Sequence, residues 1–285
     1  MKGDLRMTDN KLGSQMISGM SWKFAERLGA QGVSFIVSMV LARLLMPEDY
    51  GTVAIINVFM SIADVLLTSG LSSALIQNSK AESRDFSTIF YCNLFLSCVL
   101  YALLFISAPF LAQAYNLPIL KPAIRVFALR LPISAFQTIQ SAIISRNMEF
   151  KKFFFATIGG TLASAVVGIV LAIKGFGVWA LIFQYLTSTC INTIILAILV
   201  RWHPKIEFDF QHAKPLINYG WKIMITDLIG TIFNNLSDFV IGIKYNSSQL
   251  AFYSKGKQLP MLVRCNIYTT LISVLFPAMS KINSN

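Results

Sequence analysis

Acidic and amide side chains recur at helical spacing inside two long apolar stretches of the sequence. The two sets are Asn57, Ser61, Asp64 and Thr68, and Asp227, Thr231, Asn234 and Asp238. Steps of three and four residues place each set on one face of a helix. Intramembrane carboxylates commonly serve proton or cation transport. The candidates for ion coupling are Asp238, Asp227, Asp64 and Glu26; we favour Asp238, because Asn234 and Asn235 lie within one helical turn of it.

Basic side chains interrupt the apolar stretches as well. The candidates are Arg27, Arg130, Lys257 and Arg264. A charge at mid-bilayer costs about 2.5–3.5 kcal/mol on insertion scales, so it usually faces a protein interior or a wet cavity. Arg and Lys pair with phosphates through charge-assisted hydrogen bonds. We therefore predict a cavity that binds an anionic substrate, while a second interpretation, in which the bases only neutralise the acids, stays open.

The sequence offers no recognisable constellation for enzymatic chemistry. His203 and His212 flank a polar loop, and the cysteines lack metal-ligand spacing. A glycine-rich phosphate loop is missing too, and the connections between apolar stretches are short. We expect no enzyme activity, no cofactor and no metal site.

The elements that position these side chains must be membrane-spanning helices. Hydrophobic residues make up 55% of the 285 residues and charged residues 13%, with a mean hydropathy of +0.63. Soluble domains carry roughly 25% charged residues. Eight segments reach the length of about 20 residues that a span needs. They run near 20–46, 50–76, 86–114, 120–146, 152–174, 177–201, 215–243 and 250–280. We predict an all-α polytopic membrane protein.

Charge distribution predicts the orientation. With a cytoplasmic N-terminus, the outer connections carry only Arg43, Lys121, Lys174 and Lys244. The remaining connections hold most of the lysines and arginines, as cytoplasmic loops do. The net charge of +11 is therefore attributed to orientation in the membrane and not to nucleic-acid binding.

The stretch MPEDYG, residues 46–51, interrupts the apolar sequence with turn-forming residues. Pro47 is expected to stop the first span, and Gly51 to permit a tight entry into the second. A similar arrangement follows later, because Trp22-Lys23 and Trp221-Lys222 precede their turns by nearly equal distances. Transporters are commonly built from such repeats. We predict a first lobe over residues 1–210 and the start of a second over 211–285.

The segment LARLLMPEDYG, residues 41–51, resembles the signature of bacterial polysaccharide and O-antigen flippases. These belong to the multidrug/oligosaccharidyl-lipid/polysaccharide exporter superfamily, and the lipopolysaccharide or colanic-acid exporter branch is most similar. The likeness continues over residues 54–77 and recurs over 234–262. It implies two lobes around a central cavity with alternating access, in the bacterial cytoplasmic (inner) membrane. The same signature implies a structural turn, formed by Arg43, Pro47, Tyr50 and Gly51.

The resemblance implies a substrate as well: an oligosaccharide on a polyprenyl-pyrophosphate carrier. Membrane lipids, H⁺ or Na⁺ and other polysaccharide-assembly proteins are the further candidate partners. Members of that family have about twelve to fourteen helices in paired repeats, so we expect that this chain is truncated or that its remainder lies on another chain. The alternatives are a multidrug exporter of the same superfamily and an inactive truncated remnant.

Overall fold

The computed structural model describes residues 2–68, 75, 83–147, 149–205, 210–258 and 260–261. Within them the chain is helical and holds no strand. The helices are α1 (Lys2–Leu44), α2 (Pro47–Thr68), α4 (Ser83–Ala114), α5 (Leu120–Phe127), α6 (Arg130–Asn147), α7 (Phe150–Ile173), α8 (Val178–Val200) and α9 (Phe210–Lys244). Residues 247–258 form a further helical segment after α9.

Five of the described helices are long and apolar enough to cross a membrane. These spans are Ser21–Leu44, Pro47–Thr68, Arg84–Ala114, Phe150–Ile173 and Val178–Val200. Their surfaces carry many exposed large apolar side chains, such as Phe95 and Ile198, because lipid, and not water, is their expected solvent. The prediction of an all-α polytopic membrane protein is confirmed. Eight spans stay a prediction, since most of the last one, 250–280, lies outside the described residues.

The predicted span over 120–146 is wrong as a single helix. The structure divides it into α5 and α6, with an interruption at Ala128 and Leu129. Pro132 explains the interruption, since it has no backbone N–H to donate to Ala128 and its ring clashes with that carbonyl. Proline also disfavours the helical conformation of the residue before it. Arg130 therefore stands at the start of a new helix.

Two parts of the chain share the same plan of a long helix, a two-residue break and a second helix. In the first unit α1 ends at Leu44 and α2 begins at Pro47. In the second unit α9 ends at Lys244 and the next helical segment begins at residue 247. Counterparts in the two units lie 200 positions apart, as these boundaries show. The matching geometry supports the predicted repeat; the division into two lobes stays a prediction.

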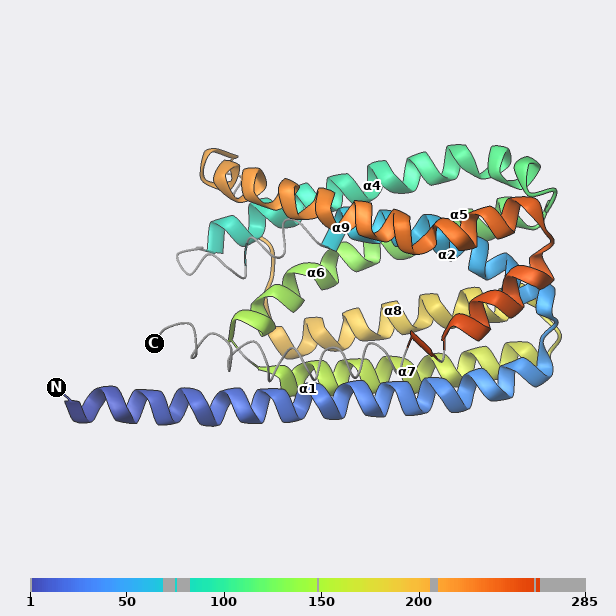
Figure 1. Cartoon of the computed structure of the whole chain (residues 1–285). Helices are drawn as coiled ribbons and strands as arrows, with labels where there is room; N and C mark the ends of the chain where they lie inside the picture. Colours follow the sequence, from blue (N-terminus) through green and yellow to red (C-terminus); the bar gives the residue numbers. More distant parts are fainter. Residues whose placement is uncertain are drawn as a thin grey trace, which may run out of the picture.

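The helices lie side by side, and the short connections 45–46, 115–119, 174–177 and 245–246 meet at one end of the bundle (Figure 1). We call this the turn end; the predicted topology puts it outside the cell. Helix α1 packs on α7, α7 on α8, and α2 on α9, while α6 contacts α4 and α8. The main apolar core includes Ile56, Met60, Ile124 and Phe127, and it joins α2 to α5 and α8.

Candidate functional site

A polar cavity of about 400 Å³ lies among α1, α2, α7, α8, α9 and residues 251–258. Its lining combines hydroxyl, amide, phenol and charged groups with apolar side chains. The polar lining residues are Ser34, Ser38, Tyr50, Asn57, Thr161, Ser164, Gln184, Tyr185, Ser188, Asn235, Asp238, Ser254, Lys255 and Gln258. The lining therefore draws on both helix–break–helix units.

Small residues shape one wall of the cavity. A Cβ added to Gly160 would lie 3.0 Å from the carbonyl oxygen of Ser188, and one added to Gly168 would lie 3.1 Å from Cγ of Gln184. Helices α7 and α8 therefore approach closely, as small residues at four-residue spacing permit. Ser164, between the two glycines, turns its hydroxyl to its own helix and donates to the Thr161 carbonyl over 2.9 Å.

Lys255 is the one cation that lines the cavity among the described residues. Its ammonium donates to the Ser38 hydroxyl over 3.0 Å. The same nitrogen lies 4.5 Å from the centre of the Tyr50 ring, a cation–π contact. Neither group carries a formal negative charge. The cavity thus holds a positive charge stabilised by a hydroxyl and an aromatic face, a setting that favours an anionic ligand.

Asp238, the favoured ion-coupling candidate, also lines the cavity. It accepts a hydrogen bond from Lys257 Nζ over 3.0 Å and one from the Ser254 hydroxyl over 3.3 Å. Lys257 donates in addition to the Asn234 carbonyl over 2.9 Å, and it is absent from the lining. The structure therefore brings two predicted residues together as an ion pair, on the edge of the cavity.

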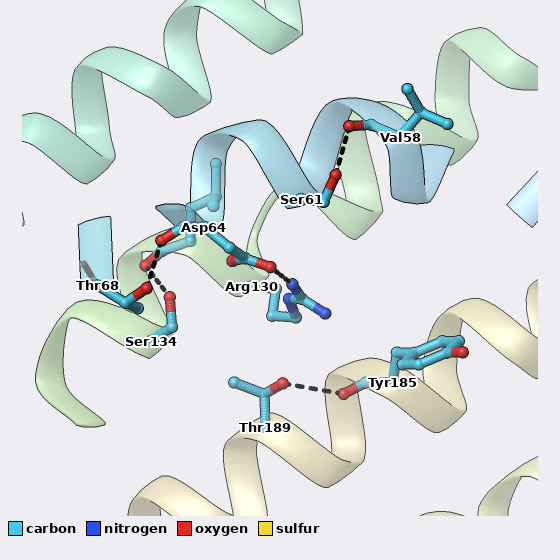
Figure 2. Close-up of polar contacts among 9 residues, drawn as sticks. Val58, Ser61, Asp64, Thr68, Arg130, Ser134, Tyr185 and Thr189 are labelled. Atoms are coloured by element: carbon cyan, nitrogen blue, oxygen red, sulfur yellow. Dashed lines mark hydrogen bonds and ion pairs between the residues drawn. The ribbon is translucent and has the colours of Figure 1, made fainter. Parts of the chain in front are cut away.

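Asp64 and Arg130 form a second ion pair, which joins α2 to the start of α6 (Figure 2). The Arg130 guanidinium also lies 5.4 Å from the centre of the Phe127 ring. In Figure 2 the pair faces the part of α8 that bears Tyr185 and Thr189. Neither Asp64 nor Arg130 lines the cavity. Asp64 lies 17 residues beyond the start of α2 at Pro47, further from the turn end than the cavity.

The other predicted side chains lie apart from the cavity. Glu26 accepts a hydrogen bond from the Thr157 hydroxyl over 2.9 Å, which ties α1 to α7. Arg27 and Asp227 are exposed on α1 and α9. Arg264 lies outside the described residues. The predicted substrate-binding set thus stays a prediction, and of it only Arg130 and Lys257 have described acidic partners.

The turn motif contributes to both packing and the cavity. The Met46 amide donates to Asp49 Oδ2 over 3.1 Å, which caps the start of α2. A Cβ on Gly51 would overlap the backbone carbonyl of Ser247. Only glycine therefore lets the first turn of α2 touch the second unit this closely. Tyr50 lies in the first turn of α2 and lines the cavity, while Arg43 and Pro47 are exposed.

Sequence reasoning missed Lys255 and the role of Tyr50 as a lining residue. A helical stripe drawn through Tyr253 and Lys257 does not include Lys255, which faces another direction on the same segment. A usable signal was available: Lys255 belongs to a stretch that resembles the flippase family, and it is a second cation beside Lys257 near the start of the predicted last span.

Proteins of known role resemble this chain over nearly its whole length. It is 24% identical to the "Succinoglycan biosynthesis transport protein ExoT" of Rhizobium meliloti (strain 1021), over 95% of this chain and 55% of that protein. It is 22% identical to the "Lipopolysaccharide biosynthesis protein WzxC" of Escherichia coli (strain K12), over 96% and 56%. The "Teichuronic acid biosynthesis protein TuaB" of Bacillus subtilis (strain 168) is 22% identical, over 94% and 56%.

This chain spans about half the length of the curated relatives it matches. No solved structure matches it. A family described as "Polysaccharide biosynthesis protein" matches residues 40–285, which include the turn motif, the cavity-lining parts of α2, α7, α8 and α9, and Lys255. Together with the apolar helices, the match confirms the resemblance seen in the turn motif: the chain is a multi-pass membrane protein of the polysaccharide biosynthesis protein family.

Proposed function

We propose that this protein flips lipid-linked oligosaccharide units across the cytoplasmic membrane during surface polysaccharide synthesis, with the cavity on the path of the substrate. The observation that carries the proposal is a polar cavity of about 400 Å³, with Lys255 in its wall, inside an apolar helix bundle. The names of the relatives, a succinoglycan transport protein and a lipopolysaccharide biosynthesis protein, support this substrate class.

Lys255 suits the anionic part of such a substrate. A pyrophosphate oxygen could replace the Ser38 hydroxyl as the acceptor of the ammonium, and a charge-assisted hydrogen bond is roughly twice as strong as a neutral one. Serine, threonine and amide side chains in the remaining wall supply further donors for the pyrophosphate oxygens. Arg27, Arg130, Lys257 and Arg264 stay candidates for later or earlier contacts along the path.

Asp238 stays the favoured candidate for ion coupling. A proton or sodium ion that binds its carboxylate competes with the Lys257 ammonium, which lies 3.0 Å away. Ion binding would therefore free Lys257 for an anionic ligand. Asp64, Asp227 and Glu26 are weaker candidates, because they do not line the cavity.

Deletion of the gene tests the proposal. A cell that lacks a flippase and keeps its glycosyltransferases should lose the surface polysaccharide and accumulate the lipid-linked oligosaccharide. The full gene product should restore export, and a Lys255→Gln version should restore much less. Unchanged polysaccharide and an unchanged lipid-linked pool in the deletion strain would contradict the proposal.

The same strains also test the alternative function, a drug exporter of the same superfamily. That function predicts increased sensitivity of the deletion strain to cationic drugs with a normal polysaccharide. A flippase predicts the reverse. The ammonium of Lys255, which contacts a hydroxyl and an aromatic ring, disfavours a cationic substrate in this cavity.

A further inference from the structure

A second hollow, separate from the cavity, opens at the turn end of the molecule. This groove of about 520 Å³ lies between the α4–α5 connection and the break after α9, and no described residue lines both the groove and the cavity. Its volume falls in the range of about 300–1,000 Å³ that is usual for small-ligand sites. The groove therefore has room for a ligand of its own.

The chemistry of the groove is aromatic and amide-rich. Its wall includes Tyr115, Asn116, Tyr245, Asn246 and Gln249. Among the described residues of the lining, Lys244 is the single charged one and none is a carboxylate. Each amide offers donors and acceptors side by side, which match the paired hydroxyls of a sugar. Tyrosine offers an apolar ring face with a polar tip, which matches the C–H face and rim of a pyranose.

Several of these groups are held in place before any ligand arrives. Tyr115 lies against Gly242, where an added Cβ would come within 2.9 Å of its ring, and it packs edge-on against Phe59 at 6.4 Å. Burial raises the pKa of Tyr115 to about 12, so that its phenol keeps the proton. Asn116 adopts a left-handed backbone with φ of 52°, and the Leu117 amide donates to the Ala112 carbonyl over 3.0 Å to close the end of α4.

The opposite wall is equally ordered. The Asn246 Oδ1 accepts a hydrogen bond from the backbone N–H of Gln249 over 2.9 Å and caps the segment that begins at residue 247. The amide nitrogen of Asn246 is then the end of that side chain that remains for a ligand. Tyr245, in the break itself, leaves 61% of its surface exposed. Tyrosines are common at membrane–water interfaces, but an interfacial position alone requires neither neighbouring amides nor a groove.

We propose that this groove is a carbohydrate-binding site, which contacts uncharged sugar residues of the transported unit at the turn end while the cavity takes its anionic part. The inference rests on the proposed function for the identity of the sugar. It assigns two separate places to the two chemical halves of one amphipathic substrate. The glycan is recognised by ring faces and amides, and the phosphate by Lys255.

A binding experiment with the full gene product in nanodiscs tests the groove. The probe is the oligosaccharide repeat released from the surface polysaccharide of the host cell, without lipid or pyrophosphate. Titration calorimetry should give saturable binding by the parent protein. Tyr245→Ala should weaken it about tenfold, a loss of 1.4 kcal/mol, and Tyr245→Phe should bind nearly as well as the parent because the ring remains. Gln249→Ala should weaken binding without lowering the thermal stability.

Lys255→Gln is the matched control, because Lys255 lines the cavity and not the groove. It should bind the lipid-free oligosaccharide as the parent does. The proposal is overturned if the parent does not bind, if Tyr245→Ala binds normally, or if Lys255→Gln alone abolishes binding. If the groove variants fail this test but the deletion strain lacks surface polysaccharide, only the carbohydrate site is disproved and the flippase function is retained. If the deletion strain makes normal polysaccharide, the flippase function is disproved.

Discussion

Two of the contacts between the helix–break–helix units have opposite character. Helix α2 of the first unit packs on α9 of the second through Ile55 beside Gly242 and through Phe59, whose ring lies 6.3 Å from that of Phe239. The segment 247–258 of the second unit instead reaches α1 through Lys255 and Ser38. One contact is apolar, and the other borders the cavity.

The difference shows that the two units of a repeat can carry different functions at equivalent positions. The counterpart of Lys255 in the first unit is Ile55, which is buried in the core. The counterpart of Asp238 is Ser38, which accepts the hydrogen bond from Lys255. Equivalent backbone positions thus carry a packing residue in one unit and a charge in the other. The apolar contact holds the units together, and the polar one leaves room for a ligand.

Among the substitutions that test the contacts between the two units, Gly51→Ala should have the largest effect on stability and export. The added methyl group would overlap the Ser247 carbonyl at the turn end, and overpacking costs typically about 1–3 kcal/mol or more. We expect a clear fall in the thermal stability of the purified protein and loss of export. The second unit has Ala251 at the equivalent position, buried without such an overlap.

Gly230→Ala is the matched control, because an added Cβ there meets nothing within 4 Å. Alanine also favours a helix over glycine by about 1 kcal/mol. Stability should stay the same or rise. Equal destabilisation by the two substitutions would contradict a special close contact at Gly51.

The apolar half of this architecture could be predicted from the sequence, and the polar half only in outline. Long apolar runs and MPEDYG locate α1, α2 and their break, because hydrophobicity and turn chemistry act locally. The interruption before Arg130 was also readable, from Pro132. The partners of the charged side chains could not be predicted. Many residues separate Asp64 from Arg130 and Ser38 from Lys255 in the sequence, and only the packing of the helices brings these side chains together.

Lys255→Gln and Lys257→Gln should separate transport from stability. Lys255 has a hydroxyl and a ring as its partners, whereas Lys257 neutralises Asp238. We expect Lys255→Gln to fold normally and to export about tenfold less, since a hydrogen bond to a charged group contributes about 1.5–3 kcal/mol. Export is measured as extracellular polysaccharide per amount of membrane protein. Normal export by Lys255→Gln would remove this residue from the site.

The Asp238–Lys257 pair should show itself in a double-mutant cycle on stability. Asp238→Asn and Lys257→Gln each leave a partly buried charge without its partner, with side-chain exposures of 32% for Lys257 and 12% for Asp238. The double variant removes both charges and should lose less stability than the two single variants together. A coupling of about 0.5–3 kcal/mol is typical of residues in contact. The Asp64→Asn and Arg130→Gln cycle should give a comparable coupling without involving the cavity wall, and strict additivity would contradict either pair.

Ser248→Ala should have the smallest effect and sharpen the picture of the turn end. The Ser248 hydroxyl donates to Glu48 Oε1 over 2.9 Å, so it is a side-chain link between the units beside the Gly51 contact. The bond is exposed, and a typical hydrogen bond contributes about 0.5–1.5 kcal/mol, so we expect a loss near the lower limit. Glu48→Gln keeps an oxygen acceptor and should be nearly neutral, whereas Glu48→Ala should match Ser248→Ala, and the double alanine variant should lose no more than either alone. If Ser248→Ala instead matched Gly51→Ala in its effect, the side-chain bond and not the backbone contact would hold the two units together at this end.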